Sequence, residues 1–441
     1  MKAGPQRAKI GSELTTVFVG LAVLLLGGRA GQAAGNLSPA ETPACASTER
    51  VSVAADGSPG NGDSVFGTVA NIGTPETPTG ISADGRFVAF SSNATNLVSL
   101  DTKGVQNVFV YDRNAHEMEL VSVDEAGQAG GGVSSFISAD GRYVVFTSGA
   151  ILTPEQANGP SSCFGFPGRC GDLLLRDRVK KTTEAVVVSD GFEILHGGSI
   201  SADGRFVSVN ATFGHPGIGV ALVDRLTHET TFIAGQGTAF DSVISSDGRF
   251  VVFGQKVFLV QAPFEIHGIA LYEVATGQTT RVDIAEDGTP GNSDSDLPSI
   301  SAHGRYVAFE SDATNLVSAD TNGQRDVFVR DIARGTIERV SVASDGTQAN
   351  GPSGFPSVSA NGRYVAFSSN ATNLAGTSPG EFLHDRLTGA TVLVALSGPG
   401  VLSGRGRVVA FGGSGLLPDD PPGILEVYAR GPIRVARRCS P

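Results

Sequence analysis

The 441-residue chain contains no tryptophan, only two methionines and four cysteines, and only 17% of its residues are charged. Without tryptophan it lacks the indole surface on which proteins often stack sugars, which weakens a sugar-stacking interpretation without excluding it. Without CxxC pairs or clustered histidines, a zinc site is not expected. Runs of Ala, Leu, Glu and Lys are scarce, so the composition argues against a helical protein.

Basic residues are outnumbered, since 32 Lys and Arg stand against 44 Asp and Glu and give a net charge of −12. An acidic surface repels phosphate backbones and anionic lipids, so we expect no nucleic-acid partner and no binding to a membrane surface. Hydrophobic residues make up 40% of the chain, and the 59 glycines suit many short strands joined by tight turns. These features exclude a disordered chain and favour an all-β fold.

The first 35 residues have the layout of a secretory signal peptide. Lys2, Arg7 and Lys9 precede an apolar run at 17–26, and small residues follow. The run is too short to cross a bilayer comfortably and no second run follows, so we expect cleavage and no stable membrane insertion; a retained anchor is the alternative. Cleavage would change the net charge to −15, because four basic residues and one acidic residue are lost. We therefore expect an exported bacterial protein, periplasmic or extracellular.

One phrase, Ser-x-Asp-Gly-Arg-aromatic-Val, returns seven times with small variations. The copies begin at Ile81, Ile137, Ile200, Ile244, Ile300, Val358 and Leu402. The Asp-Gly or Asn-Gly step can take the positive φ angles of a tight hairpin turn, so the flanking residues are predicted to be antiparallel strands. The copies start 44 to 63 residues apart, which suits propeller blades with loops of variable length.

Two further apolar strands are predicted after each hairpin. The third strand is the phrase NVFVYDR at 107–113, which returns as DVFVRD at 326–331 and FLHDR at 382–386. The fourth strand has phrases such as ELVSV, TRVDI and ERVSV. Because four strands per unit is the blade of a β-propeller, we predict a single all-β propeller of about seven blades over 49–438. A short segment at 36–48 precedes it.

The fourth-strand phrase ERVSV also occurs at 49–53, with no blade before it. We predict that this segment joins the last blade beside PIRVA at 432–436 and so closes the ring. Antiparallel pairing there would bring Cys45 near Cys439, and a disulfide between these two residues would staple the ring. Free thiols are the alternative.

The insertion at 151–172 is the most individual loop of the chain. It contains Cys163 and Cys170 within a Gly- and Pro-rich string, where a short disulfide closes easily. We expect this loop to confer binding specificity.

The repeats resemble those of TolB-like, WD-related propellers of exported bacterial proteins. The resemblance covers roughly residues 45–438, and its best-preserved stretch is SDATNLVSADTNGQRDVFVRD at 311–331. It implies a periplasmic or secreted propeller, since TolB itself is a protein-binding propeller of the cell envelope. The segment at 36–48 is too short for the separate N-terminal α/β domain of TolB, so only the propeller is implied.

The best candidate for specific binding lies within this stretch. Asp320, Asn322 and Asp326 alternate around a glycine turn, and their oxygens could hold a hard cation such as calcium. No Glu stands where an EF-hand requires one, and the sister loop at 101–107 contains Lys103. Hydrogen bonds within the turn would explain both loops without an ion, so calcium and a plain turn are the two interpretations. No other cofactor is expected.

No arrangement of catalytic residues is evident. The string at 376–380 fits GxSxG, but it replaces the loop of another repeat and lacks the strand and helix that flank a nucleophile elbow. The seven histidines show neither HxH nor HExxH spacing, and His303 merely replaces the turn Asp of its repeat. His384 belongs to a third-strand phrase and is interpreted as structural.

The Asp and Arg of the hairpin turn recur in most copies of the repeat. A catalytic residue is needed once, so residues present in most blades are expected to cap the turn or to pair with a third-strand Asp. The structural set comprises Asp84, Arg86, Asp140, Arg142, Asp203, Arg205, Asp247, Arg249, Arg305 and Arg363. The expected third-strand partners are Asp112, Asp177, Asp224, Asp331 and Asp385.

From these features we expect an exported, monomeric, non-catalytic propeller that binds an envelope or extracellular protein, or a ligand. The alternative is a metal-dependent propeller enzyme, a lyase or hydrolase, with its site at the channel mouth. Such an enzyme should focus several histidines or carboxylates from different blades on one mouth, whereas most carboxylates here occupy repeated turn positions. A third possibility is a structural component without a discrete ligand.

Overall fold

The computed structural model describes residues 46–65, 80–158, 162–163, 166–167, 171–187, 193–196, 198–212, 218–234, 239–258, 265–396 and 398–433. The expected signal peptide lies outside these residues. Cys45, Cys170 and Cys439 lie outside them too, as does the side chain of Cys163, so both expected disulfides stay predictions. Within the described part of the chain, no helix has the length and apolar character needed to span a membrane.

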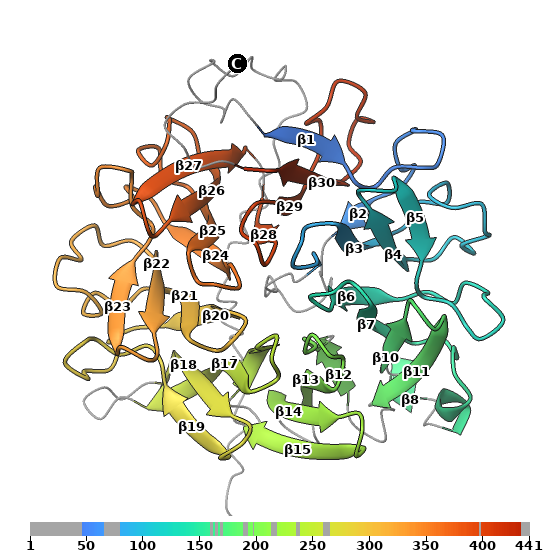
Figure 1. Ribbon diagram of the computed structural model, residues 1–441, viewed down its shortest axis with the longest axis horizontal. Coiled ribbons are helices and arrows are strands. Elements are labelled where there is room, and N and C mark those ends of the chain that lie inside the picture. Colours follow the sequence, from blue (N-terminus) through green and yellow to red (C-terminus); the bar gives the residue numbers. More distant parts are fainter. Residues whose placement is uncertain are drawn as a thin grey trace, which may run out of the picture. The chain divides into compact units, whose positions relative to one another are not determined.

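The described strands form a seven-bladed β-propeller, in which each blade is a four-stranded antiparallel sheet (Figure 1). Blade I comprises β2 (Ser64–Val65), β3 (Phe87–Ser92), β4 (Asn107–Asp112) and β5 (Glu117–Leu120), from the centre outwards. Blade II comprises β6 (Val133–Ile137), β7 (Tyr143–Ser148), β10 (Asp172–Asp177) and β11 (Thr182–Val187). Blade III comprises β12 (Glu193–His196), β13 (Phe206–Thr212), β14 (Ile218–Asp224) and β15 (Glu229–Ala234).

The later blades repeat this order. Blade IV comprises β16 (Ala239–Ile244), β17 (Phe250–Phe258), β18 (Glu265–Glu273) and β19 (Gln278–Arg281). Blade V comprises β20 (Ser295–Ile300), β21 (Tyr306–Ser311), β22 (Asp326–Asp331) and β23 (Thr336–Arg339). Blade VI comprises β24 (Ser353–Val358), β25 (Tyr364–Ser369), β26 (Gly380–Asp385) and β27 (Ala390–Ala395). The insertion in blade II adds a 3-10 turn, η1 (Glu155–Asn158), and two short paired strands, β8 (Ser162–Cys163) and β9 (Phe166–Pro167).

Blade VII joins both ends of the chain. It comprises β28 (Gly400–Leu402), β29 (Val409–Gly413), β30 (Glu426–Gly431) and the N-terminal strand β1 (Ser47–Arg50). The predicted ring closure is confirmed, because β1 pairs antiparallel with β30. The predicted partner segment at 432–436 is wrong: β30 is the third strand of its blade, and its free edge is where every other blade adds its fourth strand.

The hairpin turn between the first and second strands of a blade fits against the preceding blade. In blade II, Gly141 has a φ of +77°, and a Cβ there would lie 2.2 Å from Cδ2 of Phe87 in blade I. Within the turn, the Ser138 hydroxyl and the Arg142 backbone N–H both donate to Asp140 Oδ1, over 2.6 and 2.9 Å. The Ser-x-Asp-Gly phrase therefore builds a capped turn whose glycine leaves room for the neighbouring ring.

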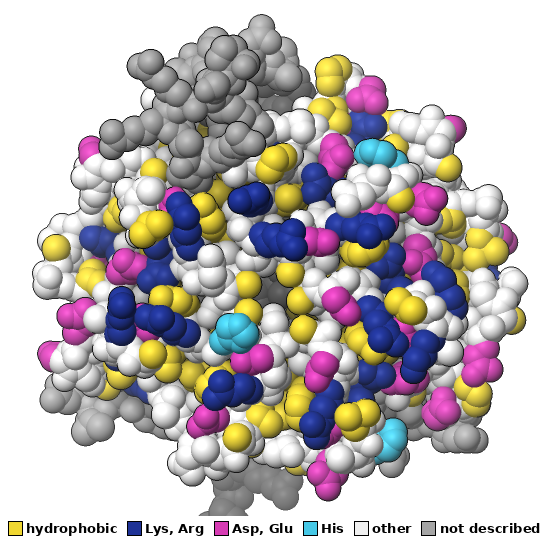
Figure 2. All heavy atoms as spheres, in the orientation of Figure 1, with side chains coloured by type: hydrophobic (Ala, Val, Ile, Leu, Met, Phe, Trp, Pro, Cys, Tyr) yellow, Lys and Arg dark blue, Asp and Glu magenta, His cyan; other side chains and the backbone are white. Residues whose placement is uncertain are grey.

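In blades I, II, III, V and VI, the Arg of the turn reaches across to the last Asp of the third strand of its own blade. The pairs are Arg86–Asp112, Arg142–Asp177, Arg205–Asp224, Arg305–Asp331 and Arg363–Asp385, with N···O distances of 2.6 to 2.7 Å. Blade IV departs from this pattern, since its third strand ends in Glu273, and Arg249 lies over the ring of Phe250. On the face drawn in Figure 2, Lys and Arg side chains surround a central hollow, with Asp and Glu between them.

The hydrophobic core consists of the faces that neighbouring blades press together. The middle residues of the second and third strands are mostly apolar, and β4, β10, β22 and β26 are buried along their whole length. Across these two strands, Phe90 stacks on Phe109 with ring centroids 5.9 Å apart, and Phe309 stacks on Phe328 at 6.0 Å. These aromatics are therefore packing residues, as the apolar character of both strand faces predicts.

Candidate functional site

Each blade has two ends, which differ in the residues available for chemistry. The first–second and third–fourth hairpins lie at one end, the turn face, and the remaining connections lie at the other, the loop face. At the turn face, the channel is lined by small and apolar residues such as Ile81, Ala83, Ile300 and Ala302. Ala302 N donates to Ala360 O of the next blade over 3.1 Å, and similar backbone bonds join other blades. None of the described residues lining this part of the channel is an acid or a base.

The residues of the calcium hypothesis come together around an arginine. Arg339 Nη1 donates to Asp320 Oδ1 over 3.0 Å and to Asp326 Oδ2 over 3.1 Å. Asn322 Nδ2 donates to the same Asp326 oxygen over 2.8 Å, and Ser341 donates to the other oxygen over 2.5 Å. The guanidinium already supplies a positive charge between the carboxylates, so a calcium ion at these residues would have to displace Arg339.

Blades V and I differ in the charge of the residue that begins the third strand, and also in the residue at the position of Arg339. The third strand begins with Asp326 in blade V and with Asn107 in blade I. Each accepts a hydrogen bond from a serine of the fourth strand. At the end of that strand, blade V has Arg339, but blade I has Leu120. In these two blades the arginine accompanies the carboxylate, as expected if it neutralises a buried charge. In blade II, where buried Asp172 begins the third strand, Gln156 donates to the carboxylate instead.

The other sequence candidates lie apart from one another. His303 is on the turn face, its side chain is 79% exposed, and Nδ1 lies 3.2 Å from Asp247 Oδ2. His384 is buried in β26 beside Thr391, and burial lowers its pKa to about 4. The string at 376–380 leads directly into β26, so it is no nucleophile elbow.

A polar cluster that the other blades do not share lies on the loop face of blades IV and V. His267 Nδ1 lies 2.8 Å from Asp296 Oδ1, and the His267 backbone N–H donates to Asp294 Oδ1 over 2.8 Å. The imidazole is 40% exposed and packs edge-on against Phe240, with centroids 4.9 Å apart. The hydrogen bond to Asp296 outweighs desolvation and raises the pKa of His267. Because Nδ1 is bonded to the carboxylate, Nε2 is the ring nitrogen through which His267 could exchange a proton with another group.

Arg325 holds the Asp296 carboxylate in place. Its guanidinium lies 3.3 Å from Asp296 Oδ2 and 2.7 Å from Asp312 Oδ2, and it also bonds Glu310. Glu310 is buried, which raises its pKa, and its Oε2 accepts a hydrogen bond from Phe355 N of blade VI over 2.9 Å. One network therefore connects blades IV, V and VI beside their first strands.

The backbone is strained beside this network. Asp241, Leu297 and Phe355 have φ angles of +51°, +49° and +55°, and they occupy equivalent bulges in the first strands of blades IV, V and VI. A non-glycine residue held in this region costs on the order of 1 kcal/mol or more. Leu297 directly follows Asp296, and Phe355 supplies the N–H that Glu310 accepts. The strain thus lies where the carboxylates are positioned.

In the sequence, residues of this cluster differ from the residues at the equivalent positions of other blades. When the blades are aligned on their second and third strands, Glu310 stands where blade I has Ser91, and His267 stands where it has Gln106. Glu310 directly follows the repeat phrase of its blade, whereas His267 lies 14 residues beyond the end of the phrase at Phe253.

No protein-family model and no curated protein matches the chain. Among solved structures, the chain is similar to an oligogalacturonate lyase in complex with manganese, at a TM-score of 0.54 and 11% identity over 88% of this chain and 96% of that one. It is also similar to the β-propeller domain of the Trilobed protease from Pyrococcus furiosus (TM-score 0.49, 10% identity, 78% and 92% covered). TolB from Acinetobacter baumannii compares at 0.41 and 14% identity, with 83% and 86% covered. At these identities the likeness shows the fold.

The comparison with the lyase overturns the prediction of a non-catalytic scaffold. The lyase matches this propeller over 96% of its own chain, so an enzyme can consist of little more than one such propeller. A propeller of this kind is therefore compatible with catalysis, and the enzyme alternative is the better supported of the two.

The metal site expected for that alternative does not fit the residues present. The described part of the chain contains no group of three or more His, Cys, Asp and Glu side chains arranged to hold a metal ion. At the loop-face cluster, the Asp296 oxygens are already bonded to His267 and Arg325.

Proposed function

We propose that the protein is an exported propeller enzyme of the lyase class, with His267 as the group that moves the proton. The observation that carries the proposal is the contact between His267 and Asp296. It leaves a half-exposed imidazole oriented by a carboxylate, which is the arrangement of a positioned general base. Arg325 acts as a positioning residue, because its guanidinium donates a hydrogen bond to Asp296.

An elimination suits this site better than covalent hydrolysis. In β-elimination the base removes a proton next to a carbonyl group, the electron pair forms a carbon–carbon double bond, and the leaving oxygen departs and takes up a proton. No nucleophile is needed. Within the described residues, the hydrogen bonds of His267 go to Asp294 and Asp296, so no hydroxyl or thiol is activated by it. The similarity to a lyase of one propeller supports the same choice.

The test is a substrate screen with matched histidine variants. The mature protein is incubated with oligogalacturonides and other uronic-acid oligosaccharides, and the ultraviolet absorbance of the unsaturated product is followed. His267→Gln should lose at least about a hundredfold in kcat, as expected for removal of a general base. His303→Gln is the control, because this imidazole also contacts an Asp but lies on the turn face. New reducing ends without the absorbance would indicate a hydrolase, and equal activity in both variants would reject His267.

The proposal also includes a TolB-like repeat class and export from the cytoplasm. The repeat phrases and the presence of TolB among similar folds support a TolB-like repeat class. The basic and apolar layout of the first 35 residues supports export. Mass spectrometry of the protein recovered outside the cytoplasm would show whether the chain begins near residue 36. A protein partner in the envelope and a monomeric state stay predictions.

A further inference from the structure

Neighbouring blades are clasped on the turn face by a repeated arginine. It directly follows the last Asp of the third strand and is Arg113, Arg178, Arg225 or Arg386 in blades I, II, III and VI. Each donates to the carbonyl of the turn glycine in its own blade and pairs with a glutamate on the fourth strand of the preceding blade. The clasp therefore places one carboxylate at each of these interfaces.

Between blades I and II, this carboxylate binds a second cation. Arg178 Nε lies 2.8 Å from Glu119 Oε2, and Lys181 Nζ lies 2.7 Å from Glu119 Oε1. Lys181 occupies the left-handed position of the third–fourth hairpin, with a φ of +60°. The equivalent position in blades IV, V and VI is glycine, the residue that adopts this conformation most readily. The chain thus shows that an ammonium group can bind beside the arginine clasp.

Between blades V and VI, the same place is open. Gly389 stands where blade II has Lys181, and a Cβ built on Gly389 would meet no atom within 4 Å. A pocket of about 650 Å³ lies at this interface. Glu338, the counterpart of Glu119, lines it with its side chain 47% exposed and bonds Arg386 through Oε1. Within the described residues, no second cation contacts this carboxylate.

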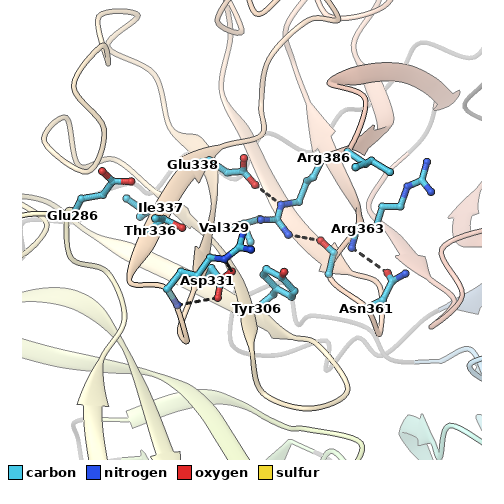
Figure 3. Close-up of a pocket in the computed structure, with 13 residues that line it drawn as sticks. Glu286, Tyr306, Val329, Asp331, Thr336, Ile337, Glu338, Asn361, Arg363 and Arg386 are labelled. Carbon is cyan, nitrogen blue, oxygen red and sulfur yellow. Dashed lines mark hydrogen bonds and ion pairs between the residues drawn. The ribbon is translucent and has the colours of Figure 1, made fainter.

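The rest of the pocket suits an alkyl stem that ends in a charge. Figure 3 shows Glu338 directed at Arg386, with Tyr306 and Ile337 lining the same pocket. The exposed side chain of Leu387 adds a further apolar surface at its rim. Glu286 contributes a second carboxylate from the blade IV side. Arg334 and Arg363 also line the pocket, but they lie near Asp331 (3.9 Å) and Asp385 (2.7 Å). The pocket therefore offers apolar walls and, in Glu338, a half-exposed carboxylate with one ion-pair partner among the described residues.

We propose that this pocket binds a primary ammonium group on an apolar stem, as carried by the lysine side chain of a peptide, with Glu338 as its ion-pair partner. The bound ammonium takes the place that Lys181 takes at Glu119. Because one exposed ion pair contributes little, affinity for a single lysine is weak, roughly millimolar. The site does not depend on the lyase proposal, since His267 lies on the opposite end of the blades.

A titration with matched peptides tests the proposal. Acetyl-Gly-Lys-Gly-amide is titrated into the mature protein and followed by NMR, with the norleucine peptide of equal stem length as the uncharged control. The lysine peptide should bind and the norleucine peptide should not. Glu338→Gln should weaken lysine binding about fivefold, the loss of one exposed ion pair. The absence of saturable lysine binding, or equal binding by Glu338→Gln, would overturn the proposal.

Two exchange variants separate a local effect from misfolding. Gly389→Lys should fill the pocket with its own ammonium and abolish peptide binding, and Lys181 shows that lysine is accepted at this φ. Lys181→Gly should open a second site at Glu119 and raise the stoichiometry from one peptide to two. Thermal unfolding of each variant checks the fold. Peptide binding that persists in folded Gly389→Lys would place the site elsewhere and refute the assignment.

Discussion

The turn face and the loop face of this propeller are built from the same strands but follow different rules. At the turn face, the Ser-x-Asp-Gly-Arg contacts recur from blade to blade, because the turn glycine must fit a side chain of the preceding blade, in most blades an aromatic ring. At the loop face, equivalent positions hold serine, glutamine, histidine, arginine or glutamate. Ring assembly constrains the first face, so residues specific to one blade, and the chemistry they allow, collect on the second.

The largest loss of stability is expected when a charge is buried without an ion-pair partner. Asn107→Asp in blade I would copy Asp326 of blade V without Arg339, and its carboxylate would face the carbonyls of Thr102 and Val105, which now accept from Asn107 over 3.0 and 2.8 Å. We expect a loss of about 4 kcal/mol in the free energy of unfolding. Adding Leu120→Arg should restore most of it. Urea unfolding measures both, and a double variant no more stable than the single one would reject charge compensation.

A comparison of two glycines tests the fit at the turn face. Gly141 and Gly127 have φ angles of +77° and +76°, but only Gly141 packs on a ring of the preceding blade; a Cβ at Gly127 would meet nothing within 4 Å. Gly127→Ala should cost about 1 kcal/mol through backbone strain alone. Gly141→Ala should cost about 3 kcal/mol, because Phe87 must also move. Equal losses on urea unfolding would mean that the contact between blades contributes nothing.

Glu426 should make ring closure sensitive to pH. Burial raises its pKa to about 7, although the hydroxyl of Ser52, just beyond β1, donates to it. A raised pKa stabilises the folded state at low pH, so this contribution is complete below about 4.5 and is lost as the pH rises through 7. Relative to wild type, Glu426→Gln should be equally stable at pH 4 and about 3 kcal/mol more stable at pH 8. If the free energies of unfolding of the two proteins changed in the same way with pH, the proposed role of Glu426 would be wrong.

The repeated Asp–Arg pairs should have the opposite pH dependence to Glu426: they stabilise the fold at neutral pH and lose this effect in acid. At Asp177, burial alone would raise the pKa, but the hydrogen bonds from Arg142 and from the backbone of Lys180 and Val179 lower it to about 2. The stabilisation is present above about 4 and is lost as the pH falls through 2. Asp177→Asn should therefore cost about 2 kcal/mol at pH 7 and nothing at pH 2. Thermal unfolding of both proteins between pH 2 and pH 7 measures this difference in stability. A difference that does not change with pH would show that ionisation of Asp177 is not its cause.

The sequence predicts what every blade must share. The spacing of Ile81, Ile137 and the later copies predicts the blades, and the Asp-Gly step of each copy predicts the hairpin turns. The lone fourth-strand phrase at 49–53 predicts ring closure. These features can be recognised because repetition marks them several times.

Contacts that occur once could not be predicted in the same way. Arg339 lies 13 residues from Asp326, and only the fold brings its guanidinium into the loop expected to hold calcium. His267 and Asp296 belong to different blades, and their contact depends on how blade IV meets blade V. Neither distance follows from spacing along the chain, because each is set by packing between strands.

The closure of blade VII also fixes an order of assembly. β1 is the first strand to be synthesised and the last to gain a partner, since Arg50 lies 370 residues from Asp420. For a free chain, a loop of that length would cost about 5 kcal/mol in closure entropy. The six blades in between reduce this cost, because once formed they hold the two ends of the arc near each other. A chain truncated before β30 would therefore not become a smaller ring but an open arc with two bare sheet faces, prone to pair with its own copies.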